Sequence, residues 1–260
     1  MIDTQIPFNS YLIGLLQSDG NNYETTRNRG KIVLELSDRD NDIIHKINQE
    51  MSNTKISKRI RNTNFKENYK SISLSIFDIK LRNDLKKYIP IGNKSKIIYK
   101  PDNVIEKDYW RGIIDGDGSL GITKNNIPFI SLVTKSNLLA NSYIEYIKNI
   151  VGVEKSTTPN KRDNIYNIML TNENAQILIK ELYYDNCFGI DRKINKAIEI
   201  LLWKRPNERI KVTWKKTKWT KYEDDFIITH TLEESMKDLN RTEKSIKIRL
   251  YRLNVCNKNI

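Results

Sequence analysis

The chain has 260 residues, of which 38% are hydrophobic and 30% charged, a composition typical of a globular protein with one or two domains. Its formal net charge is +13 and its isoelectric point is about 9.5, so the expected partner is a polyanion, and nucleic acid in particular. The two cysteines and two histidines are isolated, which argues against a disulfide framework, a cysteine-ligated zinc site or histidine-based catalysis.

The first part of the chain is expected to hold a helix that ends near Asp19, then two strands, a helix, two strands and a helix. Hydrophobic periodicity and turn residues place the strands at 23–27, 31–36, 55–61 and 70–76. They place one helix at 40–51 and another through Leu81, Leu85 and Tyr88. The same order recurs about 98 residues later, at 120–124, 128–133, 137–150, 154–158, 165–170 and 173–184. We therefore predict an α+β fold in which an α-β-β-α-β-β-α unit is duplicated with pseudo-twofold symmetry, the halves being 1–100 and 101–203.

The C-terminal part has a different character. Residues 204–218 indicate a basic linker, and residues 219–260 a small all-α domain. Capping boxes predict helices after Thr220 and Thr231, and a third helix is expected near Thr242. Three short helices that follow Trp219, the last of them basic, resemble a helix-turn-helix or Myb-like DNA-binding module. The alternative is a small helical cap packed on the rest of the protein.

One apolar segment occurs twice and ends each time in Asp-Gly. Residues 12–20 read LIGLLQSDG, and residues 110–118 read WRGIIDGDG. Small residues four apart let two helices approach backbone to backbone; they are Gly14 and Ser18 in the first copy and Gly112 and Gly116 in the second. If the two helices pack in this way, Asp19 and Asp117 emerge side by side at one end of the pair.

Such a pair of carboxylates at helix C-termini is electrostatically costly. A divalent cation between them relieves the repulsion, and carboxylates with exposed main-chain carbonyls are the hard oxygen ligands that Mg²⁺ prefers. We expect Asp19 and Asp117 to bind Mg²⁺ or Mn²⁺ with help from Ser18 and Gly116. The expected chemistry is metal-assisted hydrolysis of phosphodiesters.

Both segments resemble the LAGLIDADG motif of homing endonucleases, and the resemblance extends over residues 8–203 as in two-motif, single-chain members. It implies that the motif helices form the interface between the halves, and that two four-stranded antiparallel sheets form a saddle over the DNA. It also implies that Asp19 and Asp117 bind the catalytic metals. A member of this family cuts a long asymmetric site and leaves short 3′ overhangs. Ca²⁺ is expected to support binding without cleavage.

The chain departs from a symmetric pattern at two pairs of positions. Gln17 stands where the second copy has Asp115, and Asp38 corresponds to Lys135 at a site usually occupied by Gln or Lys in the family. By position, Lys96 and Lys193 match the basic residue that the family places near the metals. Together with Lys135 they are the candidate catalytic lysines, the alternative being solvated surface charges. From this asymmetry we expect the two DNA strands to be cut at unequal rates.

Strands that read a DNA groove should alternate core residues with polar ones. In the first half the expected DNA contacts are Tyr23, Thr25, Arg27, Arg29, Lys31, Lys58, Arg59, Arg61 and Lys70. In the second half and beyond they are Thr123, Lys124, Lys155, Lys161, Arg162, Lys211, Lys215, Lys216, Lys244, Lys247, Arg249 and Arg252. For any single residue, the alternative is an ordinary exposed sheet or helix face.

The leading hypothesis is therefore a site-specific double-strand DNA endonuclease involved in intron homing. One alternative is a maturase that binds intron RNA and assists splicing, and another is a DNA-binding regulator that does not cut. No apolar run reaches the length of a membrane span, and residues 1–10 lack a signal pattern. We expect a monomer without a membrane partner, in a bacterial cytoplasm or an organelle matrix, from a gene that belongs to a phage or mobile element.

Overall fold

The computed structural model describes residues 2–62, 67–206 and 218–253. The chain divides into two compact units, residues 1–205 and 206–260, and each is described by itself. The expected linker contacts Lys211, Lys215 and Lys216 lie outside the described residues. Among the helices that are described, none is long and apolar enough to cross a membrane.

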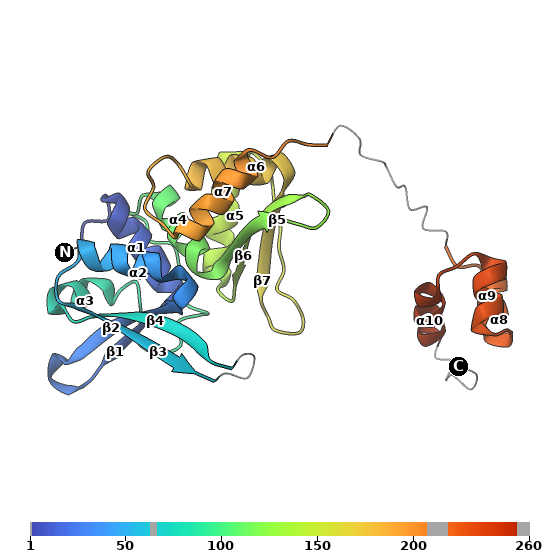
Figure 1. Cartoon of the computed structure of the whole chain (residues 1–260), viewed down its shortest axis with the longest axis horizontal. Coiled ribbons are helices and arrows are strands. Elements are labelled where there is room, and N and C mark those ends of the chain that lie inside the picture. Colours follow the sequence, from blue (N-terminus) through green and yellow to red (C-terminus); the bar gives the residue numbers. More distant parts are fainter. Residues whose placement is uncertain (1, 63–66, 207–217, 254–260) are drawn as a thin grey trace. The chain divides into compact units, whose positions relative to one another are not determined.

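The first half of the larger unit is a four-stranded antiparallel sheet with helices on one face (Figure 1). Its elements are α1 (Pro7–Asp19), β1 (Gly20–Glu24), η1 (Thr26–Asn28), β2 (Gly30–Ser37), η2 (Asp38–Asp40), α2 (Asn41–Glu50), β3 (Thr54–Arg61), β4 (Tyr69–Ile76) and α3 (Ile79–Leu85). The strand order is β1-β2-β4-β3. Alternate residues of β2, such as Ile32 and Leu34, are fully buried together with Ile43 and Ile47 of α2. This burial gives the sheet one core face and one open face.

The second half repeats this plan with one strand fewer. Its elements are α4 (Glu106–Asp117), β5 (Gly118–Ile122), β6 (Pro128–Thr134), α5 (Asn137–Val151), β7 (Tyr166–Thr171), α6 (Asn172–Leu182) and α7 (Asp191–Leu201). The strands pair antiparallel in the order β5-β6-β7, with α5 and α6 packed against them. The predicted α+β class with two antiparallel sheets is confirmed.

The prediction of a strand at 154–158 is wrong. The second sheet has three strands rather than the expected four. Asn160 N–H donates to Ile165 O at 2.9 Å and closes a turn before β7, but no ladder extends from it. Most residues from Glu154 to Thr158 are exposed, so no alternating apolar face anchors them to the core. The sequence prediction also missed α7, and it placed the first strand three residues late.

Helices α1 and α4 lie backbone to backbone at the centre of the larger unit. A Cβ added to Gly14 would sit 2.3 Å from Tyr109 O, and one added to Gly112 would sit 2.2 Å from Tyr11 O. Contacts this short leave no room for any side chain at either position. The close approach predicted from the small residues is therefore present, and it brings the two Asp-Gly ends together.

The smaller unit holds α8 (Lys221–Thr229), α9 (Leu232–Leu239) and α10 (Glu243–Arg252). Both predicted capping boxes are formed, at Thr220 and Thr231. Asn240 adopts a left-handed conformation (φ 48°) and ends α9, so a short turn leads into α10. The core contains Ile227 and Ile246. Three residues, 240–242, separate the end of α9 from the start of α10.

Candidate active site

The two motif carboxylates lie at the paired C-terminal ends of α1 and α4. A Cβ added to Gly116 would be 2.7 Å from Asp19 Oδ2, so the Asp19 carboxylate rests against the opposite helix. Burial, and then the negative charge of Asp117, raise the pKa of Asp19 to about 6. Desolvation by the surrounding protein also raises the pKa of Asp117. Both carboxyl groups are therefore held in surroundings that disfavour their ionised form.

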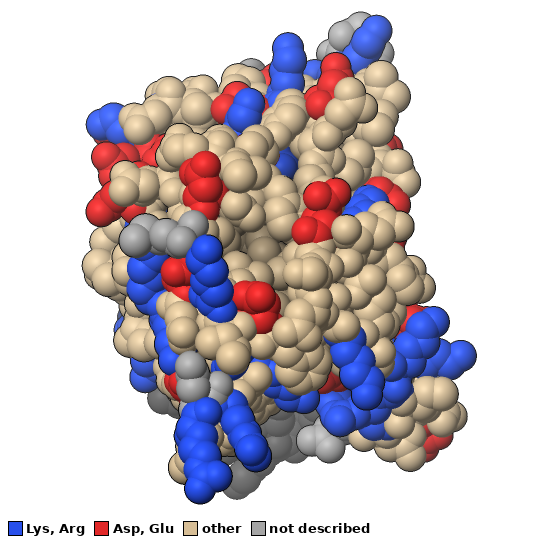
Figure 2. Space-filling view, turned by 90° about the vertical axis from the view of Figure 1, so that its left-hand side faces the viewer, with Lys and Arg blue, Asp and Glu red and all other residues tan. Residues whose placement is uncertain are grey.

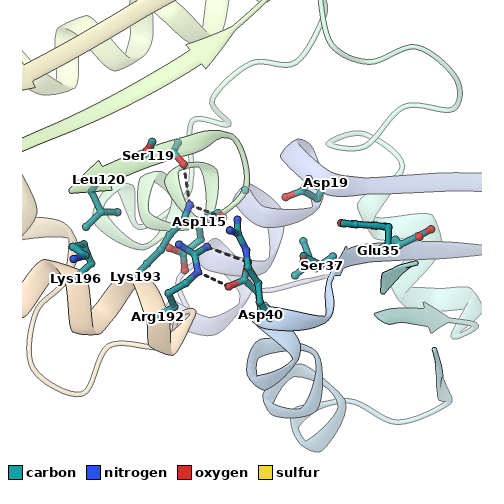
Figure 3. Close-up of a pocket in the computed structure, with 15 residues that line it drawn as sticks. Asp19, Glu35, Ser37, Asp40, Asp115, Ser119, Leu120, Arg192, Lys193 and Lys196 are labelled. Carbon is teal, nitrogen blue, oxygen red and sulfur yellow. Dashed lines mark hydrogen bonds and ion pairs between the residues drawn. The ribbon is translucent and has the colours of Figure 1, made fainter. Parts of the chain in front are cut away.

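A separate cavity borders each carboxylate. The first is shown in Figure 3 and is lined by Asp19 together with Ser37, Asp40, Asp115, Gly116, Arg192 and Lys193, among others. The second is lined by Asp117 together with Gln17, Ser18, Lys94, Ser95, Thr134 and Lys135, among others. Each cavity thus combines a carboxylate from one half with a lysine from the other half. This crossed arrangement follows from the close packing of α1 against α4.

The lysine that corresponds to Lys193 is Lys94, not Lys96. Lys193 Nζ donates to Ile114 O, to Asp115 O at 2.8 Å and to Gly118 O at 2.9 Å. Lys94 Nζ donates to the equivalent carbonyls of the first motif, Leu16 O at 2.6 Å and Gly20 O. Each lysine therefore caps the C-terminus of the motif helix in its own half.

The expectation for Lys96 is corrected, because its side chain is exposed and borders neither cavity. The sequence match that selected it aligned Gly92 with Gly189, which is out of register by two residues. Lys94 and Lys193 each precede by four positions an apolar residue that the structure buries, Ile98 or Ala197, but the sequence alone does not show which lysine reaches the carbonyls.

Burial dominates the electrostatics of both capping lysines. It lowers the pKa of Lys94 to about 8, although the nearby charges of Asp19 and Asp117 act in the opposite direction. Burial likewise lowers the pKa of Lys193, and Asp115 opposes the shift. Lys135 is exposed and borders the cavity of Asp117. The structure thus gathers three lysines around the two carboxylates.

Gln17 and Asp115 connect the helix pair rather than face solvent. Tyr109 Oη donates to Gln17 Oε1, and Tyr11 Oη donates to Asp115 Oδ2 at 2.7 Å, so each tyrosine reaches across the seam. Asp115 also accepts from Tyr183 Oη at 2.7 Å and from Ile190 N at 3.0 Å. Burial raises the pKa of Asp115, while these donors stabilise its ionised form. The tyrosine hydrogen bond across the seam is therefore present in both halves. Its acceptor is the amide oxygen of Gln17 in one and the carboxylate of Asp115 in the other.

The donor set at the helix ends fits a hard divalent cation. Among the described residues, no three His, Cys, Asp or Glu side chains cluster to hold a metal. The available ligands are the two carboxylates, main-chain carbonyls and solvent. The capping lysines leave the carbonyls of Ser18 and Gly116 uncontacted. Asp38 is half-buried and borders neither cavity, so it adds no third acid to this set.

The open face of the first sheet carries basic and hydroxylic side chains. Cross-strand register aligns Arg59 with Ser71 and Arg61 with Tyr69, on the face opposite the buried Ile72. Lys58 pairs with Ile72 and Lys70 with Ile60, so strand alternation directs these two lysines to the other face. In Figure 2, Lys and Arg gather along the lower edge, where Figure 1 draws this sheet.

The other expected DNA contacts are exposed wherever the structure describes them, with one exception. Arg249 is half-buried, forms a two-point ion pair with Asp224 (2.7 and 2.6 Å) and lies 5.8 Å from the centre of the Trp219 ring. Arg241 lies over the same ring at 4.5 Å. Arg249 therefore holds α10 against α8, with two of the five N–H groups of its guanidinium donating to Asp224.

No protein-family model matches the chain, and no curated protein matches its sequence. Among solved structures, the homing endonuclease I-WcaI bound to its DNA recognition sequence matches with a TM-score of 0.57 and 16% identity, over 76% of this chain and 88% of that chain. The I-LtrWI LAGLIDADG homing endonuclease bound to target DNA matches with a TM-score of 0.41 and 11% identity, over 97% of this chain and 98% of that chain. Full-length DUF199/WhiA from Thermatoga maritima matches with a TM-score of 0.45 and 12% identity, over 94% of this chain and 88% of that chain. At these identities the I-WcaI match establishes a shared fold.

Proposed function

We propose that the protein is a site-specific endonuclease that cuts both strands of duplex DNA. The observation that carries this proposal is the pairing of Asp19 and Asp117 at the end of the glycine-packed seam. A protein without hydrolytic function gains nothing from two carboxylates whose ionised forms it destabilises. The net charge of +13 and the basic open face of the first sheet support a polyanionic substrate. The fold shared with a DNA-bound homing endonuclease supports the same conclusion.

Asp19 and Asp117 would hold Mg²⁺ or Mn²⁺ together with the carbonyls of Ser18 and Gly116. When bound, such ions lower the pKa of a coordinated water and neutralise charge on the departing oxygen. The same ions would offset the burial of Asp19 and the repulsion from Asp117, which together raise the pKa of Asp19 to about 6. Each cavity would accommodate the scissile phosphate of one strand.

Lys94 is suited to bind that phosphate in the cavity of Asp117. An ammonium group has three hydrogens, and the two carbonyls that Lys94 contacts leave one of them for a phosphate oxygen. Lys135 adds a second positive charge at the same cavity. On the other side, Lys193 donates to three carbonyls and contributes its charge rather than a free N–H.

The smaller unit would add a second DNA contact. Lys244, Lys247 and Arg252 are exposed on α10, which follows the short turn at Asn240. If α9 and α10 act as a helix-turn-helix, the second of these helices would enter the major groove. We assign this role to α10. A tethered second contact raises the effective concentration of the first and lengthens the recognised site.

The test uses DNA from the locus of the gene with the inserted gene removed. In Mg²⁺ the protein should cut both strands within one short region, and in Ca²⁺ it should bind this DNA without cutting it. Asp19→Asn and Asp117→Asn should abolish cutting and retain binding. Failure of the wild-type protein to cut in either Mg²⁺ or Mn²⁺, with binding intact, would favour a regulator instead. Intron RNA bound more tightly than this DNA would favour a maturase.

A further inference from the structure

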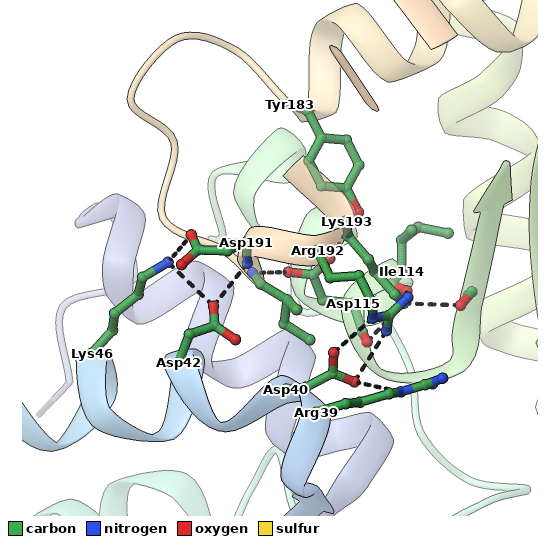
Figure 4. Close-up of polar contacts among 12 residues, drawn as sticks. Arg39, Asp40, Asp42, Lys46, Ile114, Asp115, Tyr183, Asp191, Arg192 and Lys193 are labelled. Carbon is green, nitrogen blue, oxygen red and sulfur yellow. Dashed lines mark hydrogen bonds and ion pairs between the residues drawn. The ribbon is translucent and has the colours of Figure 1, made fainter. Parts of the chain in front are cut away.

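A network of charged groups joins the two halves on one side of the seam (Figure 4). Arg192, at the start of α7, donates through Nε to Asp40 Oδ1 at 2.7 Å and through Nη2 to Asp40 Oδ2 at 3.0 Å. Arg39 Nε reaches the same carboxylate at 3.3 Å. Beside it, Lys46 Nζ donates to Gly189 O at 2.9 Å. The start of α7 is therefore tied to the start of α2.

The Asp40 carboxylate depends on this pairing. Asp40 is only 6% exposed, and a buried charge that loses its partner is strongly destabilising. Burial acts to raise the pKa of Asp40, but the two hydrogen bonds and the charge of Arg192 outweigh it and hold this pKa below its usual value. A two-point arginine–carboxylate pair also fixes the angle of its partners. The pair therefore orients the first turn of α7.

The residue after Arg192 in the chain borders the cavity of Asp19. Lys193 is 5% exposed, and its three carbonyl contacts come from the end of α4 and the start of β5. Asp40, Arg192 and Lys193 line the same cavity (Figure 3). The position of the Lys193 ammonium near Asp19 therefore depends on the carbonyls of α4 and β5 and on the contacts that hold the start of α7, of which the Asp40–Arg192 pair is nearest in sequence to Lys193.

The opposite side of the seam has a different arrangement. There Asn93 precedes Lys94, as Arg192 precedes Lys193, and Ser136 caps α5 at the position that Asp40 holds before α2. Ser136 Oγ donates to Ile98 O. Neither Asn93 nor Ser136 carries a charge, so this hydrogen bond, and not an ion pair, joins Ser136 to the other half. Among the described residues that line the two cavities, an ion pair between the halves is present at the Asp19 cavity, from Arg192 to Asp40, and absent at the Asp117 cavity.

We propose that Asp40 and Arg192 are a positioning pair for Lys193, and that they set the cleavage rate of the one DNA strand served by the Asp19 cavity. This inference rests on the proposed endonuclease function. Neither residue acts on the phosphate directly. A misplacement of the ammonium by about 1 Å is enough to change the rate on the order of tenfold to a hundredfold. The other strand, served by Lys94, should be nearly unaffected.

The experiment follows each strand separately, with differently labelled ends, in single-turnover cleavage of the same target DNA in Mg²⁺. Asp40→Asn and the milder Arg192→Lys should slow one strand on the order of tenfold and leave DNA affinity in Ca²⁺ unchanged. The slowed strand should be the one that Lys193→Met slows and Lys94→Met does not. Asp40→Asn should add little to Lys193→Met, because residues that act through one group are not additive.

Controls separate this effect from general damage to the fold. Glu173→Gln breaks another two-point pair, that with Arg205, which borders neither cavity, and should leave the ratio of strand rates unchanged. The exchange of both charges, Asp40→Arg with Arg192→Asp, should restore part of the slowed rate. Equal slowing of both strands, or an unchanged ratio in Arg192→Lys, would overturn the inference. Absence of cutting by the wild-type protein would overturn the proposed function itself.

Discussion

The raised pKa of Asp19 makes the stability of the folded protein depend on pH. In the unfolded chain its carboxyl has a pKa near 3.8, whereas burial and the charge of Asp117 raise the folded-state pKa to about 6. Between these values the unfolded chain releases the proton and the folded protein keeps it. The contribution of Asp19 to the free energy of unfolding of the metal-free protein therefore falls as pH rises from about 4 to 6.

We expect Asp19→Asn to remove this fall in the free energy of unfolding. At pH 7 the substitution should raise the free energy of unfolding in EDTA by about 2–3 kcal/mol, and at pH 4 it should change little. Urea unfolding of both proteins from pH 4 to 8 measures the difference. Asp185→Asn, at an exposed acid, serves as the matched control. Parallel pH profiles for Asp19→Asn and wild type would show that Asp19 is not under electrostatic strain.

At the level of secondary-structure elements, the seam between α1 and α4 depends on glycine. Gly14→Ala places a methyl group 2.3 Å from a backbone oxygen of the opposite helix, and neither backbone can yield without separating the pair. The expected cost is at least about 3 kcal/mol. Gly121→Ala meets only the Phe129 ring, at 3.2 Å, and that side chain can shift, so its cost should stay below about 1 kcal/mol. Equal thermal stability of the two variants would contradict the close packing.

Helix α10 supplies a second contrast between elements, because two of its arginines have different surroundings. Arg249→Gln removes the two-point pair with Asp224, so hydrogen exchange of α8–α10 should become faster. Arg252→Gln changes an exposed residue and should weaken DNA binding without altering the exchange. The opposite pattern would assign the DNA contact to Arg249.

Patterns along the sequence predicted the elements that have a strong local signature. The matched Asp-Gly motifs gave the seam and the positions of Asp19 and Asp117, and the threonine caps gave the helices of the smaller unit. Contacts distant in sequence were not predictable. The choice between Lys94 and Lys96 depends on which ammonium reaches carbonyls 74 to 78 residues earlier in the chain. The Asp40–Arg192 pair spans 152 residues, and no local pattern marks it.

For the whole molecule, the division into two compact units allows the larger unit to be studied alone. Residues 1–205 contain the helix pair, both cavities and both sheets. Gln176 Nε2 donates to Trp203 O at 2.8 Å, and Trp203 Nε1 donates to Asn126 O at 3.0 Å. Trp203, near the end of this unit, is therefore hydrogen-bonded to two elements of its second half. Removal of residues 206–260 should leave the fold of the larger unit intact.

A chain that ends at Arg205 should still cut the target DNA at high protein concentration, because both cavities are retained. It should bind more weakly and protect a shorter stretch of DNA, since the contacts of α10 are lost. Each phosphate contact that disappears should reduce the slope of log affinity against log salt by about 0.9. The full-length triple variant Lys244→Gln, Lys247→Gln, Arg252→Gln is the matched control and should reproduce most of this change. A footprint and salt slope equal to those of the full chain would mean that the smaller unit makes no DNA contact.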